Sequence, residues 1–244
     1  MSEARNAILA RIREARGRGP LSAETARQLE ERVTAHRRNL VPRRAAALDR
    51  AGQVDLFVAM AEEVQTSVAR VASAAAVPEA VARYLASENL PAELVMAPDP
   101  TLDAYPWNEW PMLAIRRAAA AAGDAVSLTP CLAAIAETGT LMLTSGPERP
   151  TTLNFLPDTH IVVLRAAQVV ACYEDGWDLL RAAKAEGLPR TVNLITGPSR
   201  TGDIEQRIQL GAHGPRRLHI ILVEEERVAG DGEAEEPGGH LGGR

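Results

Sequence analysis

Two short turns in this 244-residue chain combine residue types that can hold an anion. One reads TSGPER over residues 144–149 and the other TGPSR over residues 196–200, and each places an arginine three residues after its glycine. Backbone N–H groups, a Ser or Thr hydroxyl and an arginine fork suit a carboxylate or a phosphate. The turns therefore predict an anion site. The alternative is that Gly-Pro merely closes two connections after strands.

The candidate contacts in the first turn are Ser145, Gly146 and Arg149. In the second turn they are Thr196, Gly197, Ser199, Arg200, Thr201 and Asp203. Ile204 and Ile208 follow at helical spacing, so we expect a helix over 203–210 whose N-terminus adds unpaired N–H groups. Asp203 and Glu205 would then lie in its first turn. Their charge favours a single carboxylate over a multiply charged phosphate.

A third candidate is the segment AETGT over residues 136–140. Glu137 is expected between a short helix and a strand, with Thr138 and Gly139 beside it. A carboxylate at that junction is able to act as a nucleophile, a base or a hydrogen-bond acceptor. The simpler interpretation is that Glu137 accepts a hydrogen bond from a neighbouring backbone N–H.

The remaining chemistry-bearing residues are scattered. Cys131 and Cys172 are the two cysteines, and neither belongs to a set with metal-ligand spacing, so we expect no disulfide and no cluster on this chain. The five histidines contain no i,i+4 pair, and no metal site is expected. Lys184 is the only lysine, which excludes a phosphate-loop lysine in the second turn.

We expect three parts along the chain, which differ in charge and composition. Residues 1–50 hold 12 arginines and 6 acidic residues, and are expected to form a helical N-terminal arm. Residues 51–228 are expected to form the main domain. Residues 229–244 form an acidic, glycine-rich tail that is too polar to bury a core. The arm contains no aromatic residue, so nucleic-acid binding is not expected. Its charge suits docking on a partner subunit, and the simpler alternative is that its arginines lie on solvated helix faces.

The segments that must position the turns alternate between apolar runs and helical stretches. The expected helices cover residues 4–16, a stretch after Ser22, 45–63, 78–85, 112–122, 131–136, 173–187 and 203–210. The expected strands are SVARVA, ELVMAP, AVSLTP, GTLMLTSG, HIVVLR, TVNLIT and LHIILVE. This pattern predicts an α/β fold with about seven strands in an open, mostly parallel sheet. Ligands bind beyond the carboxyl ends of such strands, so both turns are expected to face one crevice.

No apolar run approaches the roughly 18 residues that span a membrane. The arginine-rich N-terminus contains Glu3 and Glu14 and has no apolar segment typical of a signal peptide. We therefore expect a cytoplasmic protein.

Two blocks carry a resemblance to a known family. AIAETGTLMLTSGPERPTTLNFLPDTHIVVL and LITGPSRTGDIEQRIQLGAHGPRRLHIILVE resemble the lactate-utilisation protein C family, whose members are stand-alone LUD-domain proteins. The resemblance spans about 129–224, and looser likeness reaches back to residue 50. The family pattern usually has alanine where this chain has Gly202.

The resemblance implies a Rossmann-like open sheet, similar to the sugar-phosphate isomerases and CoA transferases. It also implies a part in bacterial oxidation of L-lactate to pyruvate, with two partner proteins that carry the iron–sulfur clusters. This chain would bind no cofactor itself and would contact a small carboxylate. The family supplies no established catalytic residue. Glu137, Ser199, Arg200, Thr201, Asp203 and Glu205 are therefore transferred only as motif positions.

Two other functions stay open at this point. One is a self-sufficient enzyme of the CoA-transferase or isomerase type that uses Glu137, and only fold analogy supports it. The other is a structural or regulatory protein that binds partners through its basic arm. The sequence also leaves open whether the chain forms a homo-oligomer.

Overall fold

The structure is a computed structural model that describes residues 3–17, 19–38, 41–183, 187–204 and 207–224. Residue contacts divide the chain into two compact units, Met1–Leu40 and Val41–Arg244. The tail expected over 229–244 lies outside the described residues.

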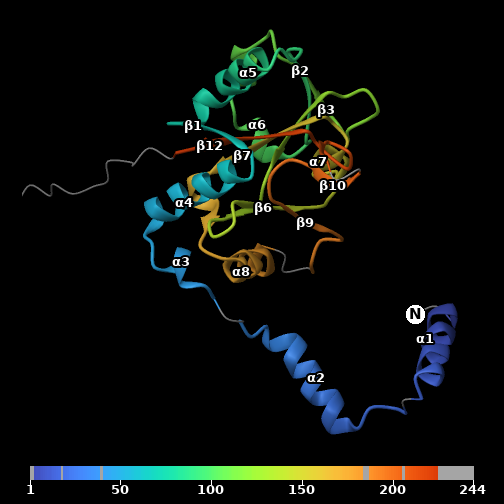
Figure 1. Cartoon of the computed structure of the whole chain (residues 1–244). Helices are drawn as coiled ribbons and strands as arrows, with labels where there is room; N and C mark the ends of the chain where they lie inside the picture. Colours follow the sequence, from blue (N-terminus) through green and yellow to red (C-terminus); the bar gives the residue numbers. More distant parts are fainter. Residues whose placement is uncertain (1–2, 18, 39–40, 184–186, 205–206, 225–244) are drawn as a thin grey trace, which may run out of the picture. The chain divides into compact units, whose positions relative to one another are not determined.

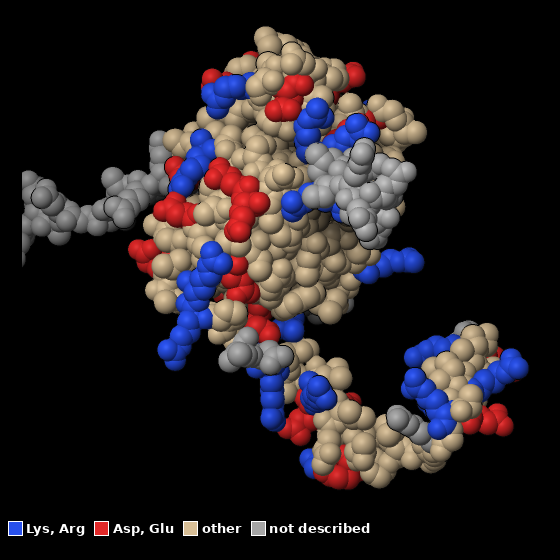
Figure 2. All heavy atoms as spheres, in the orientation of Figure 1, with Lys and Arg blue, Asp and Glu red and all other residues tan. Residues whose placement is uncertain are grey.

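The first unit consists of two helices, α1 (Glu3–Ala15) and α2 (Ala23–Ala35). The hydroxyl of Ser22 accepts a hydrogen bond from the Thr25 N–H at 3.1 Å and so caps α2, as its position predicts. Neither helix buries a residue, and basic side chains surround α1 in Figure 2. The described residues of this unit therefore form two helices without a buried core.

The second unit is built on an all-parallel sheet of six strands in the order β1-β12-β7-β4-β2-β3 (Figure 1). These strands are β1 (Ser67–Val71), β2 (Glu93–Met96), β3 (Ala114–Arg117), β4 (Val126–Pro130), β7 (Thr159–Arg165) and β12 (Arg217–Val223). Five of them match expected strands, because near-continuous apolar runs are typical of a parallel sheet covered on both faces. The prediction of an α/β fold with an open, mostly parallel sheet is confirmed.

Alternate residues of the central strands feed two separate cores. Ile161 and Val163 of β7 pack on one face with α5, whereas Val162 and Leu164 pack on the other with α4. The helices of the second unit are α3 (Arg43–Ala46), α4 (Arg50–Glu63), α5 (Val77–Ser87), α6 (Pro100–Asp103), α7 (Thr152–Phe155) and α8 (Tyr173–Ala183). Short 3-10 helices cover Ala74–Ala76, Trp107–Glu109 and Ala166–Gln168. Among the described helices none is long and apolar enough to cross a membrane.

A second sheet packs on the α4 side, in the order β8-β5-β6-β9. Its strands are β5 (Ala133–Ile135), β6 (Thr140–Thr144), β8 (Val169–Val170) and β9 (Val192–Ile195). β6 runs antiparallel to both β5 and β9, and β8 runs parallel to β5. Two strands that we expected in the main sheet, GTLMLTSG and TVNLIT, belong to this one, so the idea of a single seven-stranded sheet is wrong.

Three expected helices are also wrong. Residues 112–122 contain the edge strand β3, and residues 131–136 contain β5. Residues 203–210 lie in a hairpin of β10 (Arg200–Ile204) and β11 (Arg207–Leu210), and Glu205 lies outside the described residues. Strand pairing outweighs local helix propensity in all three segments, because short apolar runs fit either state.

Candidate functional site

The AETGT segment forms the tight turn between β5 and β6. Gly139 has φ +64°, a left-handed conformation that glycine adopts without strain. A Cβ at this position would overlap the backbone N of Ala61 in α4. Position 139 therefore requires glycine for two reasons, which are its left-handed conformation and the close approach of α4. Glu137 lies in a β-turn and not at the end of a helix, which corrects the expectation.

The Gly197 turn reaches the same helix from β9. Gly197 has φ +78°, and a Cβ there would lie 2.5 Å from the carbonyl oxygen of Val64, just after α4. The pairs Leu141 with Ile195 and Thr144 with Val192 place the end of β9 beside the start of β6. The two glycine turns of the resembling blocks thus come together on the C-terminal end of α4.

Four hydroxyls join these turns, and we call Thr138, Thr140, Tyr173 and Thr196 the hydroxyl cluster. Thr140 Oγ1 lies 2.7 Å from Thr138 Oγ1, 2.7 Å from Thr196 Oγ1 and 3.0 Å from the Tyr173 hydroxyl. Thr140 is fully buried, so its hydroxyl has no contact with water and these side chains provide its hydrogen-bond partners. The cluster fastens the two turns to each other.

Glu137 lies at the edge of the hydroxyl cluster. Its Oε1 accepts a hydrogen bond from the Tyr173 backbone N–H at 3.3 Å, and the residue is half-buried. That contact agrees with the simpler interpretation of this carboxylate, as an acceptor for a neighbouring backbone group.

The Gly-Pro-x-Arg turns do not face one crevice. Since β6 and β9 are antiparallel, the turn after Thr144 lies at one end of the second sheet and the turn after Ile195 at the other. No helix follows the Gly197 turn, because Arg200 begins β10. Arg200 is exposed. The anion site that we expected from a helix N-terminus at Gly197 is therefore not formed in that way.

The Gly197 turn instead lines an apolar cavity of about 200 Å³, which we call the Gly197 cavity. Six of its lining residues are His160, Leu194, Gly197, Ser199, Pro215 and Leu218. Among the described residues that line it, none is Lys or Arg. The Ser199 hydroxyl accepts the His213 backbone N–H at 3.3 Å, which ties the turn to the loop before β12.

His160 of β7 is fully buried beside this cavity. Its Nε2 lies 2.8 Å from Thr129 Oγ1, and its Nδ1 has no hydrogen-bond partner among the described residues. Burial lowers the pKa of His160 to about 3, so the ring is neutral at physiological pH. The Gly197 cavity therefore offers no fixed positive charge to an anion from its described lining.

The first Gly-Pro turn lies at the carboxyl edge of the parallel sheet. The N–H and carbonyl groups of Gly146 and Arg149 bond each other at 3.3 and 3.1 Å, and Ser145 Oγ accepts the Thr191 N–H at 2.9 Å. These bonds close the turn and position the arginine side chain. Gly146 thus supports Arg149 through the backbone, and the Ser145 hydroxyl holds the turn against Thr191.

Arg149 is held by two buried groups. Its Nε donates to the Asp99 carboxylate, and its Nη1 donates to Thr144 Oγ1 at 3.2 Å. Asp99 is only 1% exposed, and it also accepts from the Thr101 N–H at 2.9 Å and the Thr101 hydroxyl at 2.6 Å. Burial acts to raise the pKa of Asp99, but the hydrogen bonds from Thr101 and Arg149 outweigh it and hold the pKa below its usual value. Asp99 is therefore charged and paired.

Arg149 lines a cavity of about 290 Å³, which we call the carboxyl-edge cavity. Six of its lining residues are Tyr105, Cys131, Arg149, Val163, Arg165 and Gln168. Gln168 bridges two strand ends, since its Nε2 donates to the Cys131 carbonyl at 2.7 Å and its Oε1 accepts the Arg165 N–H at 2.8 Å. Burial raises the pKa of the Cys131 thiol to about 12, so the thiol stays protonated.

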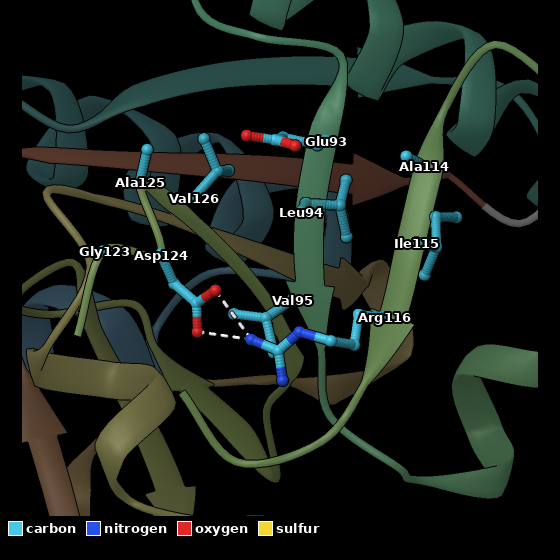
Figure 3. Close-up of a pocket in the computed structure, with 10 residues that line it drawn as sticks. All are labelled: Glu93, Leu94, Val95, Ala114, Ile115, Arg116, Gly123, Asp124, Ala125 and Val126. Carbon is cyan, nitrogen blue, oxygen red and sulfur yellow. Dashed lines mark hydrogen bonds and ion pairs between the residues drawn. The ribbon is translucent and has the colours of Figure 1, made fainter. Parts of the chain in front are cut away.

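A third cavity, of about 390 Å³, is lined by residues of β2 and β3 and of the segment that leads into β4 (Figure 3). Arg116 Nη2 donates to both oxygens of Asp124, at 2.6 and 2.5 Å, so the two charges neutralise each other. Glu93 also lines this cavity and adds negative charge. The cavity is the largest of the three, but its electrostatics disfavour an anion.

Reasoning from the sequence missed four residues of these sites: Asp99, His160, Arg165 and Tyr173. Two of them carried a usable signal. Arg165 ends the expected strand HIVVLR, and Asp99 closely follows the expected strand ELVMAP, so both lie where ligands of parallel sheets bind. Across the described residues no group of three or more His, Cys, Asp or Glu is arranged to hold a metal ion. Cys131 and Cys172 are both buried, free thiols.

Comparison with known proteins gives one family and several relatives. Residues 54–223 match the family model of the LUD domain. Over 101 residues the chain is 43% identical to Lactate utilization protein C of Deinococcus radiodurans, covering 41% of this chain and 46% of that protein. Over 91 residues it is 35% identical to Lactate utilization protein C of Bacillus subtilis, covering 36% and 38%. The matched segments thus span less than half the length of these curated relatives.

A solved structure is also similar. The crystal structure of a DUF162 family protein from Deinococcus radiodurans superposes with a TM-score of 0.55 at 29% identity. The superposition covers 72% of this chain and 99% of that one. This likeness agrees with the open α/β sheet described above.

Proposed function

Because the chain belongs to the LUD domain family, we propose that it functions in lactate utilisation, as a component that binds a small carboxylate while two iron–sulfur partner proteins carry the electrons. The observation that carries this proposal is the extent of the family match. It begins inside α4 and ends at Val223, the last residue of β12, so it includes both sheets and every glycine turn of the site. Curated relatives named for lactate utilisation add the biological context.

The cysteines support the proposed division of labour. Cys131 and Cys172 are both buried and belong to no group arranged around a metal within the described residues. Clusters need several thiolate ligands, and the thiol of Cys131 is held protonated by its burial. We therefore assign the clusters to partners, and the contact with the carboxylate substrate to this chain.

A growth experiment tests the role. Deleting the gene should abolish growth on L-lactate as the only carbon source and leave growth on pyruvate intact, because pyruvate is the expected product. The full chain supplied in trans should restore growth on lactate. Equal growth of the deletion and parent strains on lactate would overturn the proposal.

A copurification experiment tests the partners. The tagged chain, purified from its native cell, should bring down two iron-containing proteins and support lactate-dependent dye reduction. The same preparation depleted of this chain should lose that activity. A preparation that keeps full activity without the chain would remove it from the reaction.

The alternative of a CoA-transferase or isomerase depends on Glu137. This residue lines none of the three cavities described above, and its Oε1 is engaged by Tyr173 N–H. Nothing observed favours this alternative over the first proposal. Turnover of an acyl-CoA by the purified chain, lost in Glu137→Gln, would establish it.

A further inference from the structure

We propose that the carboxyl-edge cavity binds a small monocarboxylate, with Arg165 as its charge partner and Arg149 as a fixed second donor. The inference rests on the proposed role in lactate utilisation and moves the binding site away from the Gly197 turn. It stands on three features of the cavity, which are its place in the sheet, its charge and its size.

The cavity lies where ligands of open parallel sheets bind. Pro130 ends β4 and Arg165 ends β7, and both residues line the cavity. Thr101, a few residues beyond the end of β2, lines it as well. Three carboxyl ends of neighbouring strands therefore surround one space, the arrangement in which α/β proteins place a substrate.

The charges in the cavity leave one positive charge without a partner. Arg149 is neutralised by Asp99, with which it forms a buried ion pair. Arg165 also lines the cavity and has no acidic partner within the described part of the chain. One uncompensated guanidinium matches one carboxylate, and a doubly charged phosphate would find only half of its charge balanced.

Arg149 contributes geometry more than charge. A guanidinium has five N–H donors, and the contacts with Asp99 and Thr144 engage only its Nε and Nη1. Because both acceptors are almost fully buried, the guanidinium plane is fixed before a ligand arrives. A fixed donor costs little conformational entropy on binding, which favours recognition of a flat carboxylate.

The size and lining of the cavity restrict the ligand further. Its volume of about 290 Å³ is at the lower end of the range of about 300–1,000 Å³ that is typical of ligand pockets. Val163, Leu132 and Pro130 supply an apolar wall, and the neutral Cys131 thiol adds no competing negative charge. A carboxylate with a short carbon chain, such as lactate or pyruvate, fits these limits.

Calorimetric titration of the full chain with L-lactate and with pyruvate tests the proposal. Arg165→Ala should weaken binding of both by roughly ten- to a hundredfold, the range for a hydrogen-bonded charged group. The matched control is Arg83→Ala, which removes the same charge from an exposed helix position that is 66% accessible. That control should bind like the parent. Lactamide, which lacks the carboxylate charge, should bind the parent at least tenfold more weakly than lactate.

Two results of the titration would overturn the proposed site, and a further variant tests the alternative site. No binding by the parent up to about 10 mM, or binding by Arg165→Ala within twofold of the parent, overturns the proposed site. Ser199→Ala probes the Gly197 cavity, and weakened binding by that variant with normal binding by Arg165→Ala would place the carboxylate there instead. Circular dichroism of each variant confirms that it is folded.

The growth test separates failure of the site from failure of the function. If growth on lactate needs the chain but Arg165→Ala binds and grows normally, the site is wrong and the function stands. If the chain binds carboxylates through Arg165 but its deletion leaves growth on lactate unchanged, the function is wrong and the site stands.

Discussion

Thr140 Oγ1 and Thr196 Oγ1 lie 2.7 Å apart, although 56 residues separate them in the chain. Thr140 is the first residue of β6, directly after the turn from β5, and Thr196 belongs to the turn after β9. Their contact closes a loop that includes β7, α8 and the carboxyl-edge residues Arg149 and Arg165. It joins the two motif turns directly, so it is expected to contribute to stability rather than to ligand contact.

The contact predicts coupling between the two threonines. In a double-mutant cycle, Thr140→Val and Thr196→Val should show an interaction energy of about 0.5–1.5 kcal/mol, because each single variant already removes their hydrogen bond. Urea unfolding monitored by circular dichroism measures it. Thr144→Val with Thr196→Val is the control pair, since Thr144 lies at the far end of β6, and it should be additive. Additive behaviour of the first pair would contradict the proposed coupling.

Gly139→Ala should destabilise the second unit by about 3 kcal/mol or more, since the added methyl meets the α4 backbone and the left-handed φ is strained. Gly123→Ala separates the two causes. Gly123 also has positive φ, +95°, but nothing lies within 4 Å of its added Cβ, so only about 1–2 kcal/mol is expected. Equal losses for the two variants in urea unfolding would show that contact with α4 costs nothing.

Asp99→Asn should lower the free energy of unfolding by about 2–3 kcal/mol, because it leaves the Arg149 guanidinium without its buried counter-charge. The estimate allows for the 30% exposure of the arginine side chain. Asp103→Asn breaks an exposed pair with Arg117 and should cost about 1 kcal/mol or less. Because the folded pKa of Asp99 lies below 3.8, the difference from the parent should be complete above that pH and shrink below it.

The buried histidines predict a loss of stability in mild acid. His160 has a pKa of about 3 and His219 of about 4, because burial disfavours the charged ring. The unfolded chain takes up these protons near pH 6.5, so stability is complete above that pH and falls as the pH decreases towards 4. Each ring should contribute up to about 1.4 kcal/mol per pH unit in this window.

Urea unfolding of parent and His160→Gln between pH 7 and 4.5 measures this effect. The variant should lose stability less steeply with falling pH than the parent, whatever its stability at neutral pH. His213→Gln, at an exposed position, controls for the loss of a histidine elsewhere. Identical slopes for parent and His160→Gln would contradict the assignment.

Much of the parallel sheet was predictable from local sequence. Thr159–Arg165 is a strand because its run of apolar residues is buried on both faces, and the same reasoning located β1, β2, β4 and β12. Gly139 and Gly197 were singled out as ligand contacts, and the structure shows that each allows α4 to pack closely against its turn. This close packing could not be predicted from the local sequence. The helix that packs on Gly139, α4, lies some 75 residues earlier in the chain.

The prediction of secondary structure was wrong for segments whose state depends on pairing with strands distant in the sequence. Ala133–Ile135 forms a strand because β6 pairs with it on one side and β8 on the other, and nothing in an apolar run of this length separates a strand from a buried helix. Ala114–Arg117 is an edge strand beside β2, followed by an alanine-rich run that favours a helix. Arg165 was overlooked because no motif marks it, although it ends an expected strand, and the strand ends that meet at the cavity make it a binding candidate.

The close fit of α4 to two glycines decides how short a version of this protein is able to fold. A fragment that began at Ser67 would keep every strand of both sheets. It would still uncover Gly139 and Gly197 and lose the fully buried Phe57 and Ala61. The smallest autonomously folding fragment must therefore begin upstream of Asp49, whose carboxylate caps α4 by accepting the Gly52 N–H at 2.8 Å. Expression boundaries drawn at the first strand would give an aggregating product.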